Sequence, residues 1–276
     1  MLLNTPWDVG EAFTCSVIQL FSFSAFRHHD HMWRMIFVLS LLFSSFDAQL
    51  AQGETNEAED TSAGLPKEYS DYLIASKTLS PDRNFAVIYP KTELCPDEPK
   101  KGSENRCKDY LVSLQPFQVL TVLDTKYPEF QNKNNGGMSA VWLKNGSAVL
   151  VTLDSKWGPG DIFLCEIHDG KLSRSTNLLK KVHDLLVPDF KKARAGRYNE
   201  YFDFVFESGE DEVPVCEFAD STHVRIRAAA TTEPKGIAGE KAWDGAVDAT
   251  WDIPSAKFSS QKVTRKFAGI RKESDL

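Results

Sequence analysis

The residues best placed to do chemistry lie between Asp154 and Asp169. The segment "LDSKWGPGD" puts Asp154, Trp157 and Asp161 on one connecting loop, where two acids beside an aromatic ring could bind a sugar or a cation. Ordinary tight turns have the same composition, because Asp side chains cap backbone N–H groups and Trp packs on a sheet edge. We therefore expect a structural turn here, and we keep a hydrolase that uses these acids as the alternative function.

A second polar set follows on the next predicted strand. Glu166 and His168 are two residues apart, so a strand places them on one face, where they could act as an acid–base pair or as metal ligands. Asp169 belongs to the turn with Gly170, and no second cluster in the sequence completes a site. A solvated strand end is the simpler interpretation of this set.

The most concentrated basic stripe is formed by His223, Arg225 and Arg227 in "THVRIRAAA". Strand alternation places all three on one face, and Arg presents paired donors that suit a carboxylate or a phosphate. Acids close in the sequence, Glu217 and Asp220, would instead balance an ordinary exposed sheet face. We expect the balanced face and keep the stripe as a binding candidate.

Several classes of activity have no support in the sequence. It contains no G-x-S-x-G elbow, H-E-x-x-H helix, Walker loop or dinucleotide fingerprint. His183 lies at the edge of the apolar face of a predicted helix, where interfacial packing is a more common role than catalysis. The formal net charge of -7 argues against a nucleic-acid partner. We expect no cofactor and no metal site.

The compartment is indicated by residues 35–46, "MIFVLSLLFSSF". This uncharged run is shorter than the ~20 residues of a spanning helix, and it is typical of the apolar part of a signal peptide. Small polar residues follow it, and we place cleavage between Ala48 and Gln52. We predict a signal peptide over residues 32–51 that starts at Met32 or Met35. The protein is then periplasmic or secreted, with no stable membrane span after cleavage.

Residues 1–31 then form a spurious extension, because an export signal normally begins at the N-terminus. A retained signal-anchor and a buried helix are the alternatives for residues 32–51. The cluster "RHHDH" resembles a metal site, but it falls in this extension, and metal ligands need a folded scaffold. Residues 52–68 are polar and predict a flexible linker. Residues 69–276 are expected to form a single β-rich domain.

The cysteines of the mature chain are consistent with export, which permits disulfides. Cys95 and Cys107 bracket "CPDEPKKGSENRC", a loop with little core of its own, and we predict a bridge between them. Cys165 and Cys216 lie in apolar, strand-like contexts. They either pair with each other or remain buried thiols. The spacings match neither a C-x-x-C redox site nor a zinc ribbon.

The clearest structural signal is an antiparallel meander over residues 139–173. Asn145-Gly146 separates two β-rich runs, and this dipeptide favours a tight type I′ hairpin. Residues 158–160, "GPG", predict another turn, and Asp169-Gly170 predicts a second tight one. Three or four antiparallel strands should result.

One prominent amphipathic helix is expected at about residues 176–195. Leucines and valines recur there at helical spacing, and Ser175 or Thr176 is a suitable cap. Pro188 should kink or restart the helix, and Gly196 should end it. With the strands that precede and follow, the fold class is mainly β (α+β), with antiparallel meander sheets and one helix.

The segments "SPDRNFAVIYP" and "WLKNGSAVLVTL" resemble the repeats of TolB-type, WD40-like β-propellers. The alignment matches Pro81-Asp82 to Lys144-Asn145, about 63 residues apart, whereas a blade takes about 40 to 50 residues. An insertion is therefore implied, and Arg83 stands where the repeat prefers Gly. The resemblance implies propeller-blade-like meanders and the protein-binding role that such proteins often have in the bacterial envelope.

The sequence as a whole predicts an exported, non-enzymatic binding domain. Its partner would be an unknown protein or polymer of the cell envelope or extracellular space. The alternative is an extracytoplasmic hydrolase whose acids come from Asp154, Asp161 and Glu166, with His168 beside them.

Overall fold

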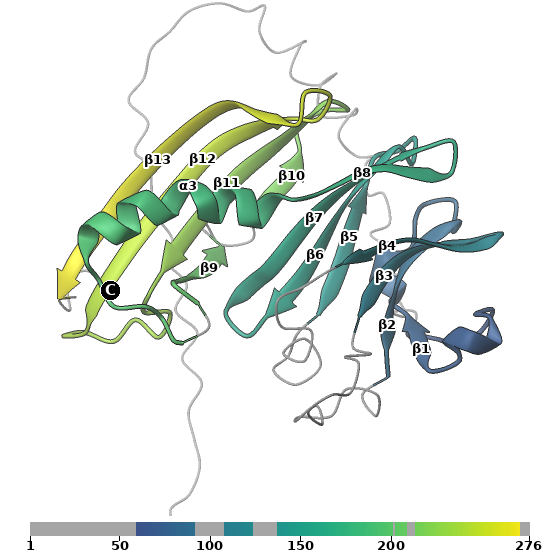
Figure 1. Ribbon diagram of the computed structural model, residues 1–276, viewed down its shortest axis with the longest axis horizontal. Coiled ribbons are helices and arrows are strands. Elements are labelled where there is room, and N and C mark those ends of the chain that lie inside the picture. The colour runs from purple at the N-terminus through teal and green to yellow at the C-terminus, as the bar shows by residue number, and fades with distance from the viewer. Residues whose placement is uncertain (1–58, 92–107, 124–136, 201, 209–212, 271–276) are drawn as a thin grey trace, which may run out of the picture. The chain divides into compact units, whose positions relative to one another are not determined.

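The computed structural model describes residues 59–91, 108–123, 137–200, 202–208 and 213–270 (Figure 1). They all belong to one compact unit that spans residues 56–276. This part of the chain consists of three antiparallel sheets, one α-helix and short 3-10 turns, so the predicted fold class is confirmed. Three predicted features lie outside the described residues: the extension, the signal peptide and the Cys95–Cys107 bridge.

The first sheet is a four-stranded meander in which each strand pairs with the next. Its strands are β1 (Tyr72–Ile74), β2 (Phe85–Pro90), β3 (Asp109–Leu114) and β4 (Phe117–Leu123). The 3-10 turn η1 (Lys67–Tyr69) belongs to a segment that packs on one face of the sheet. The 3-10 turn η2 (Ser76–Thr78) lies beside β2, where Thr78 Oγ1 accepts the N–H of Val87 at 2.8 Å. Leu65 and Tyr69 of the segment that contains η1 pack against Ile88 and Val112 of the sheet.

The second sheet is a meander of the same topology. Its strands are β5 (Met138–Trp142), β6 (Ala148–Ser155), β7 (Gly158–His168) and β8 (Lys171–Asn177). Val149 and Cys165 pack against the first sheet, whereas Leu150 and Leu164 pack in the core that contains the helix and the third sheet. Because β6 and β7 are buried on both faces, their sequences are continuous apolar runs and do not alternate.

The turns that precede β2 and β6 are closely similar. In the turn before β2, the N–H of Arg83 donates to the carbonyl of Ser80 at 2.8 Å, and the N–H of Ser80 donates to the carbonyl of Phe85 at 2.9 Å. In the turn before β6, the N–H of Gly146 donates to the carbonyl of Leu143 at 2.8 Å, and the N–H of Leu143 donates to the carbonyl of Ala148 at 2.9 Å. Arg83 and Gly146 both have positive φ angles, of 59° and 69°. The family resemblance itself stays a prediction.

Two turn predictions were wrong in detail. Residues 143–147 separate β5 from β6, and the expected type I′ turn at Asn145-Gly146 is absent, because Asn145 keeps a negative φ. Its Oδ1 accepts the backbone N–H two residues later at 3.1 Å, which stabilises a wider turn. Asp169-Gly170 does have positive φ at both residues, 49° and 73°. Residues 158–160 begin β7, and the chain turns at Lys156-Trp157 instead.

The predicted helix is present as α3 (Leu178–Ala193). Its cap is Asn177 and not Ser175 or Thr176, because β8 continues to Asn177, whose side chain accepts a backbone N–H of the first turn at 2.9 Å. The helix passes through Pro188 without interruption, since its buried face holds both halves against the sheets. It ends one position after Ala193 at Arg194, which is left-handed with φ 53°, and not at Gly196.

The third sheet contains β10 (Cys216–Phe218), β11 (His223–Thr231), β12 (Lys241–Asp252) and β13 (Lys257–Ile270), and β9 (Val205–Ser208) also pairs with β11. Figure 1 shows α3 lying along one face of this sheet. The predicted alternation in β11 is confirmed, because Val224 and Ile226 are fully buried between partly exposed polar neighbours.

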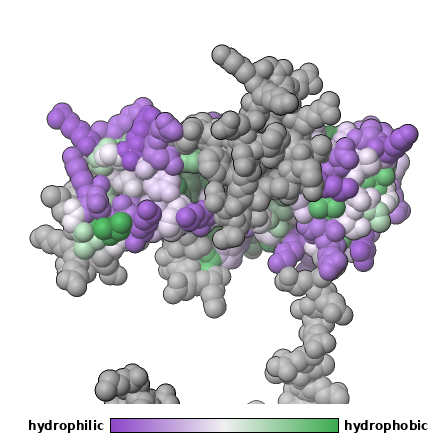
Figure 2. All heavy atoms as spheres, turned by 90° about the horizontal axis from the view of Figure 1, so that it is seen from below, coloured by the Kyte–Doolittle hydropathy of each residue, from purple (hydrophilic) through white to green (hydrophobic). Residues whose placement is uncertain are grey.

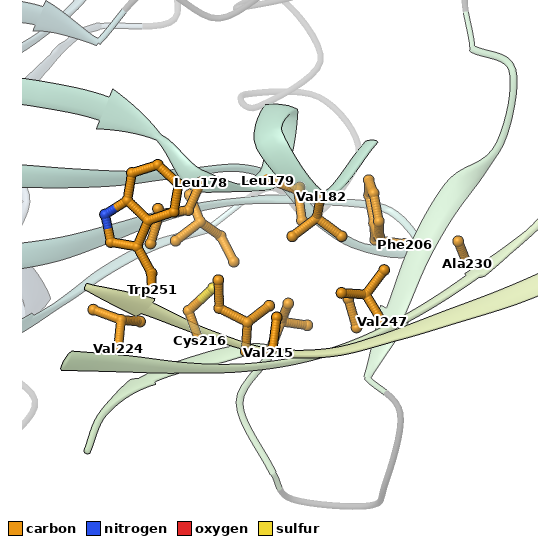
Figure 3. Close-up of a cluster of buried hydrophobic side chains, with 14 of the residues drawn as sticks. Leu178, Leu179, Val182, Phe206, Val215, Cys216, Val224, Ala230, Val247 and Trp251 are labelled. Atoms are coloured by element: carbon orange, nitrogen blue, oxygen red, sulfur yellow. The ribbon is translucent and has the colours of Figure 1, made fainter. Parts of the chain in front are cut away.

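The core between α3 and the third sheet is continuous (Figure 3). Leu178 and Val182 of the helix point toward Val224 and Val247 of the strands. Trp243 is completely buried in the same core, and its Nε1 donates to Asp189 of α3 at 3.2 Å. No helix in the described ranges is long and apolar enough to cross a membrane.

Candidate functional site

The basic stripe lies on the solvent-facing side of β11, as the alternation predicts, but it is neutralised there. Arg225 is ion-paired with Asp248 of β12, and Arg227 with Glu217 of β10. His223, Arg225 and Arg227 are each half-buried. Because both guanidinium groups already have carboxylate partners, the stripe is a charge-balanced sheet face and not an open anion site.

His223 is held between two acids at the end of the same stripe. Its Nδ1 lies 3.0 Å from Asp220, and its Nε2 lies 3.5 Å from Asp252. The hydroxyl and the backbone N–H of Thr222 donate to Asp220 and lower the pKa of that carboxyl to about 2. Asp220 is therefore an acceptor that orients the loop and the imidazole, and it has no proton to donate near neutral pH.

The prediction that Asp154 and Asp161 share a loop was wrong, because Asp154 lies in β6 and Asp161 in β7, and the two acids have separate roles. Asp161 accepts a hydrogen bond from the side-chain amide of Asn177 at 2.6 Å, so it orients the residue that caps α3. Asp154 is half-buried at the end of β6, and burial raises the pKa of its carboxyl. Asp161 is a positioning residue for the helix start.

Glu166 and His168 do not form an acid–base pair. Arg174 of β8 donates to both carboxylate oxygens of Glu166, at 2.6 and 2.8 Å, and also to the carbonyl of Ile253. The bidentate pair joins β8 to β7, and the bond to Ile253 links the second sheet to the loop between β12 and β13. His168 is 84% exposed at a hairpin tip, beside the equally exposed Asp169. It is a solvated strand end, as the simpler interpretation predicts.

Two of the acids proposed for hydrolysis are not brought together in one place. Asp161 and Glu166 lie on opposite faces of β7, because they are an odd number of residues apart. Their positions are also separated by about 16 Å along the strand at ~3.3 Å per residue. Their side chains already bond to Asn177 and Arg174, so the described geometry gives the hydrolase alternative no support.

Trp157 is half-buried at the turn between β6 and β7, with the ammonium group of Lys156 5.1 Å from its ring centre. The next residue, Gly158, has φ 138° and lies against the backbone carbonyl of Phe206 in β9. The loop is therefore packed against the third sheet at this point. This close approach is structural, and it leaves Trp157 as part of a packed junction.

Cys165 and Cys216 are both free and buried. Cys165 belongs to the core between the first two sheets, whereas Cys216 belongs to the core around α3. Burial raises the pKa of both thiols, that of Cys165 to about 11. The structure thus has the second of the two predicted alternatives, buried thiols, because the two side chains point into different cores.

His183 is the interfacial residue that its position on α3 predicts. Its ring stacks on Phe204 with a centroid distance of 4.8 Å, and its Nε2 lies 3.8 Å from Asp203. Burial lowers the pKa of this imidazole, against the opposing effect of Asp184 and Asp203. Asp203 is in turn bound by Arg197 at 2.8 Å, so the group is a packed network.

The structure draws attention to two features that the sequence candidates did not include. The first is Asp109, an acid at the start of β3 whose side chain is 3% exposed. Its Oδ2 is buried and has no hydrogen-bond partner among the described residues. The sequence signal was available, because Asp109 is two residues before Leu111 and so shares the core face of the strand.

The second feature is the edge strand β5, "MSAVW", which carries no charged residue. Among the described strands it pairs with β6 alone. The bond from the Leu143 N–H to Ala148, with the β5–β6 register, points the N–H and C=O groups of Ser139 and Val141 toward β6. The main-chain groups of Met138, Ala140 and Trp142 therefore face the edge with which no other described strand pairs.

The side chains of β5 add an apolar exposed residue to this edge. Val141 is 54% exposed. It lies on the face of the second sheet that packs against α3 and the third sheet, but that packing buries Leu150 of β6 and Leu164 of β7 and leaves Val141 of β5 exposed. Trp142 points the other way, stacks on Phe85 at 5.7 Å, and donates from Nε1 to the carbonyl of Thr78 at 3.0 Å. These contacts anchor one end of the strand.

Comparisons with known proteins identify no relative. No protein-family model, no curated protein and no solved structure matches this chain. Within the described ranges, no group of three His, Cys, Asp or Glu side chains is arranged to hold a metal ion.

Proposed function

We propose that this domain is a non-catalytic module that binds another polypeptide by adding one of its strands to β5. The observation that carries the proposal is the uncharged outer edge of β5, which pairs with no other described strand and has Val141 exposed beside it. Natural proteins usually protect exposed edges with Lys, Pro or a covering element, because such edges recruit other strands. Strand addition is an established mode of peptide recognition.

The main-chain geometry defines what a bound strand would contact. The outward N–H and C=O groups of Met138, Ala140 and Trp142 alternate along the edge and match the spacing of an extended peptide. An apolar residue of that peptide would pack beside Val141. The contacts of Trp142 with Phe85 and Thr78 hold the edge in a preformed shape, which lowers the entropy that binding must remove.

The surface of the domain is consistent with recognition at an edge. Among the coloured residues visible in Figure 2, hydrophilic residues predominate and hydrophobic residues form small separate areas. A strand edge needs no large apolar patch, because main-chain hydrogen bonds supply much of the affinity.

We further propose that the partner is a polypeptide of the cell envelope or extracellular space. The support is the apolar segment 35–46 with its polar flanks, which is typical of a signal peptide that begins at Met32 or Met35. The resemblance to TolB-type propellers supports the same setting by analogy. The intact mass of protein secreted by a host tests export, because a mature chain that starts near Gln52 is expected.

Selection of phage-displayed random peptides on the wild-type domain tests the binding mode. The selected peptides are then measured against Ala140→Pro, which removes an outward N–H, and against Ala140→Ser, which keeps it. Loss of one hydrogen bond and the bulk of the ring should weaken binding about tenfold or more in the proline variant alone. Circular dichroism confirms that both variants fold. Peptides that bind both variants equally, or a selection without β5-dependent binders, would contradict the proposal.

A further inference from the structure

Asp109 is a carboxyl group buried between two sheets. It stands opposite Leu123 in the β3–β4 register and two residues before Leu111 on the same strand. Both leucines belong to the core cluster in which the first sheet packs on the second. Strand alternation therefore places the Asp109 side chain on that packed face, where it is 3% exposed.

Among the described residues, no positive charge acts on Asp109. Burial is the single cause of its altered pKa, so no described cation acts on it. Its Oδ2 has no hydrogen-bond partner in the part of the chain that the structure describes, and the Tyr89 hydroxyl donates to Asp60 at 2.6 Å instead. The titratable side chains on the described strands of the two sheets include acids, phenols and a thiol: Tyr72, Tyr89, Tyr110, Asp154, Asp161, Cys165 and Glu166. The basic ones are His168 and Lys171, which are exposed, and Arg174, which is paired with Glu166.

An unpaired carboxylate is far more expensive to bury than a neutral carboxylic acid, because the charge loses its hydration without compensation. The buried, unpartnered position of Asp109 therefore favours the protonated form while the two sheets are packed. We propose that Asp109 is a proton-binding site in the packing between the first and second sheets. The domain takes up a proton when these sheets pack, and the packing loosens when that proton leaves.

The direction of the pH effect follows from the two states. Burial raises the pKa of Asp109 from 3.8 to about 7 in the folded domain, whereas the unfolded chain keeps the ordinary value. The folded state thus binds more protons between these values. The stabilisation that the bound proton gives to the folded domain is complete below about pH 4 and is lost as the pH rises through about 7. A difference of about three pKa units corresponds to a change of roughly a thousandfold in the folding equilibrium constant.

Two substitutions with the same chemistry separate this site from other acids. Asp109→Asn keeps the size of the side chain and cannot ionise. Asp169→Asn makes the same change at an exposed hairpin tip, where positive φ suits Asn. Urea denaturation of the three proteins is followed from pH 4 to pH 8. Relative to Asp109→Asn, the wild type should lose about a thousandfold in its folding constant over this range, and Asp169→Asn should follow the wild type.

A second measurement stands even if Asp109→Asn does not fold. The carboxyl carbon of Asp109 in the wild-type domain is titrated by NMR, and amide exchange of β2–β4 and of β11–β12 is compared at pH 5 and pH 8 after correction for intrinsic rates. We expect a titration near pH 7 and a loss of protection in β2–β4 alone. A titration near pH 4, or a wild-type pH dependence that Asp109→Asn retains, would overturn the proposal. The inference is independent of strand binding at β5.

Discussion

Gly158→Ala should be the most damaging single-methyl substitution in the junction between the second and third sheets. Gly158 has φ 138°, a backbone conformation that residues with a Cβ rarely adopt. A Cβ at this position would stand 2.5 Å from the backbone oxygen of Phe206 in β9. Since that atom belongs to a paired strand, it cannot rotate away, and β9 would have to move from β7.

Two other glycines allow the loss of unfolding free energy in Gly158→Ala to be divided into backbone strain and steric collision. Gly146→Ala adds a methyl group in open space at φ 69°, so it measures backbone strain alone, about 1 to 2 kcal/mol. Gly245→Ala has no unusual φ, but its Cβ would lie 2.5 Å from the ring of Trp243, so it measures a collision alone, about 1 to 3 kcal/mol. Gly158→Ala combines both effects, and we expect it to lose about 4 kcal/mol of unfolding free energy.

Urea denaturation followed by tryptophan fluorescence and by circular dichroism gives these three differences. The loss of unfolding free energy should be smallest for Gly146→Ala, larger for Gly245→Ala and largest for Gly158→Ala. A loss of about 4 kcal/mol is a large part of the roughly 5 to 15 kcal/mol that stabilises a typical domain, so the three variants are compared at low temperature. A value for Gly158→Ala within about 0.5 kcal/mol of Gly146→Ala would refute the close packing of β7 on β9.

Three further predictions use single residues. Arg83→Gly should raise the unfolding free energy by about 1 kcal/mol, because a non-glycine residue is disfavoured at φ 59°; denaturation that shows a loss would contradict this. Wild-type stability should fall more steeply than that of His183→Gln as the pH drops below about 6.5, since burial lowers the folded-state pKa of His183 and the unfolded chain binds the proton more readily; parallel pH curves would be evidence against it. A thiol reagent at pH 8 should label Cys165 and Cys216 in urea but not in the native protein, and rapid native labelling would exclude their burial.

Local spacing predicted the elements of this domain well. The alternation of "THVRIRAAA" indicated a half-buried strand, and β11 has that pattern. The helical spacing of leucines indicated the helix that forms α3, although its cap and its passage through Pro188 depend on β8 and on burial against the sheets. The sequence also aligned Arg83 with Gly146, because the conformation of a turn depends mainly on the residues within it.

The state of the polar residues was decided by tertiary packing. Spacing placed His223, Arg225 and Arg227 on one face, but it could not show that acids from β10 and β12 neutralise the two arginines. Nor could it show that Cys165 and Cys216 enter different cores. Pairing and burial depend on which sheets meet, and those contacts join residues far apart in the chain. Asp109 is the clearest case, because an ordinary acid at a strand start became a buried one only when the second sheet packed over it.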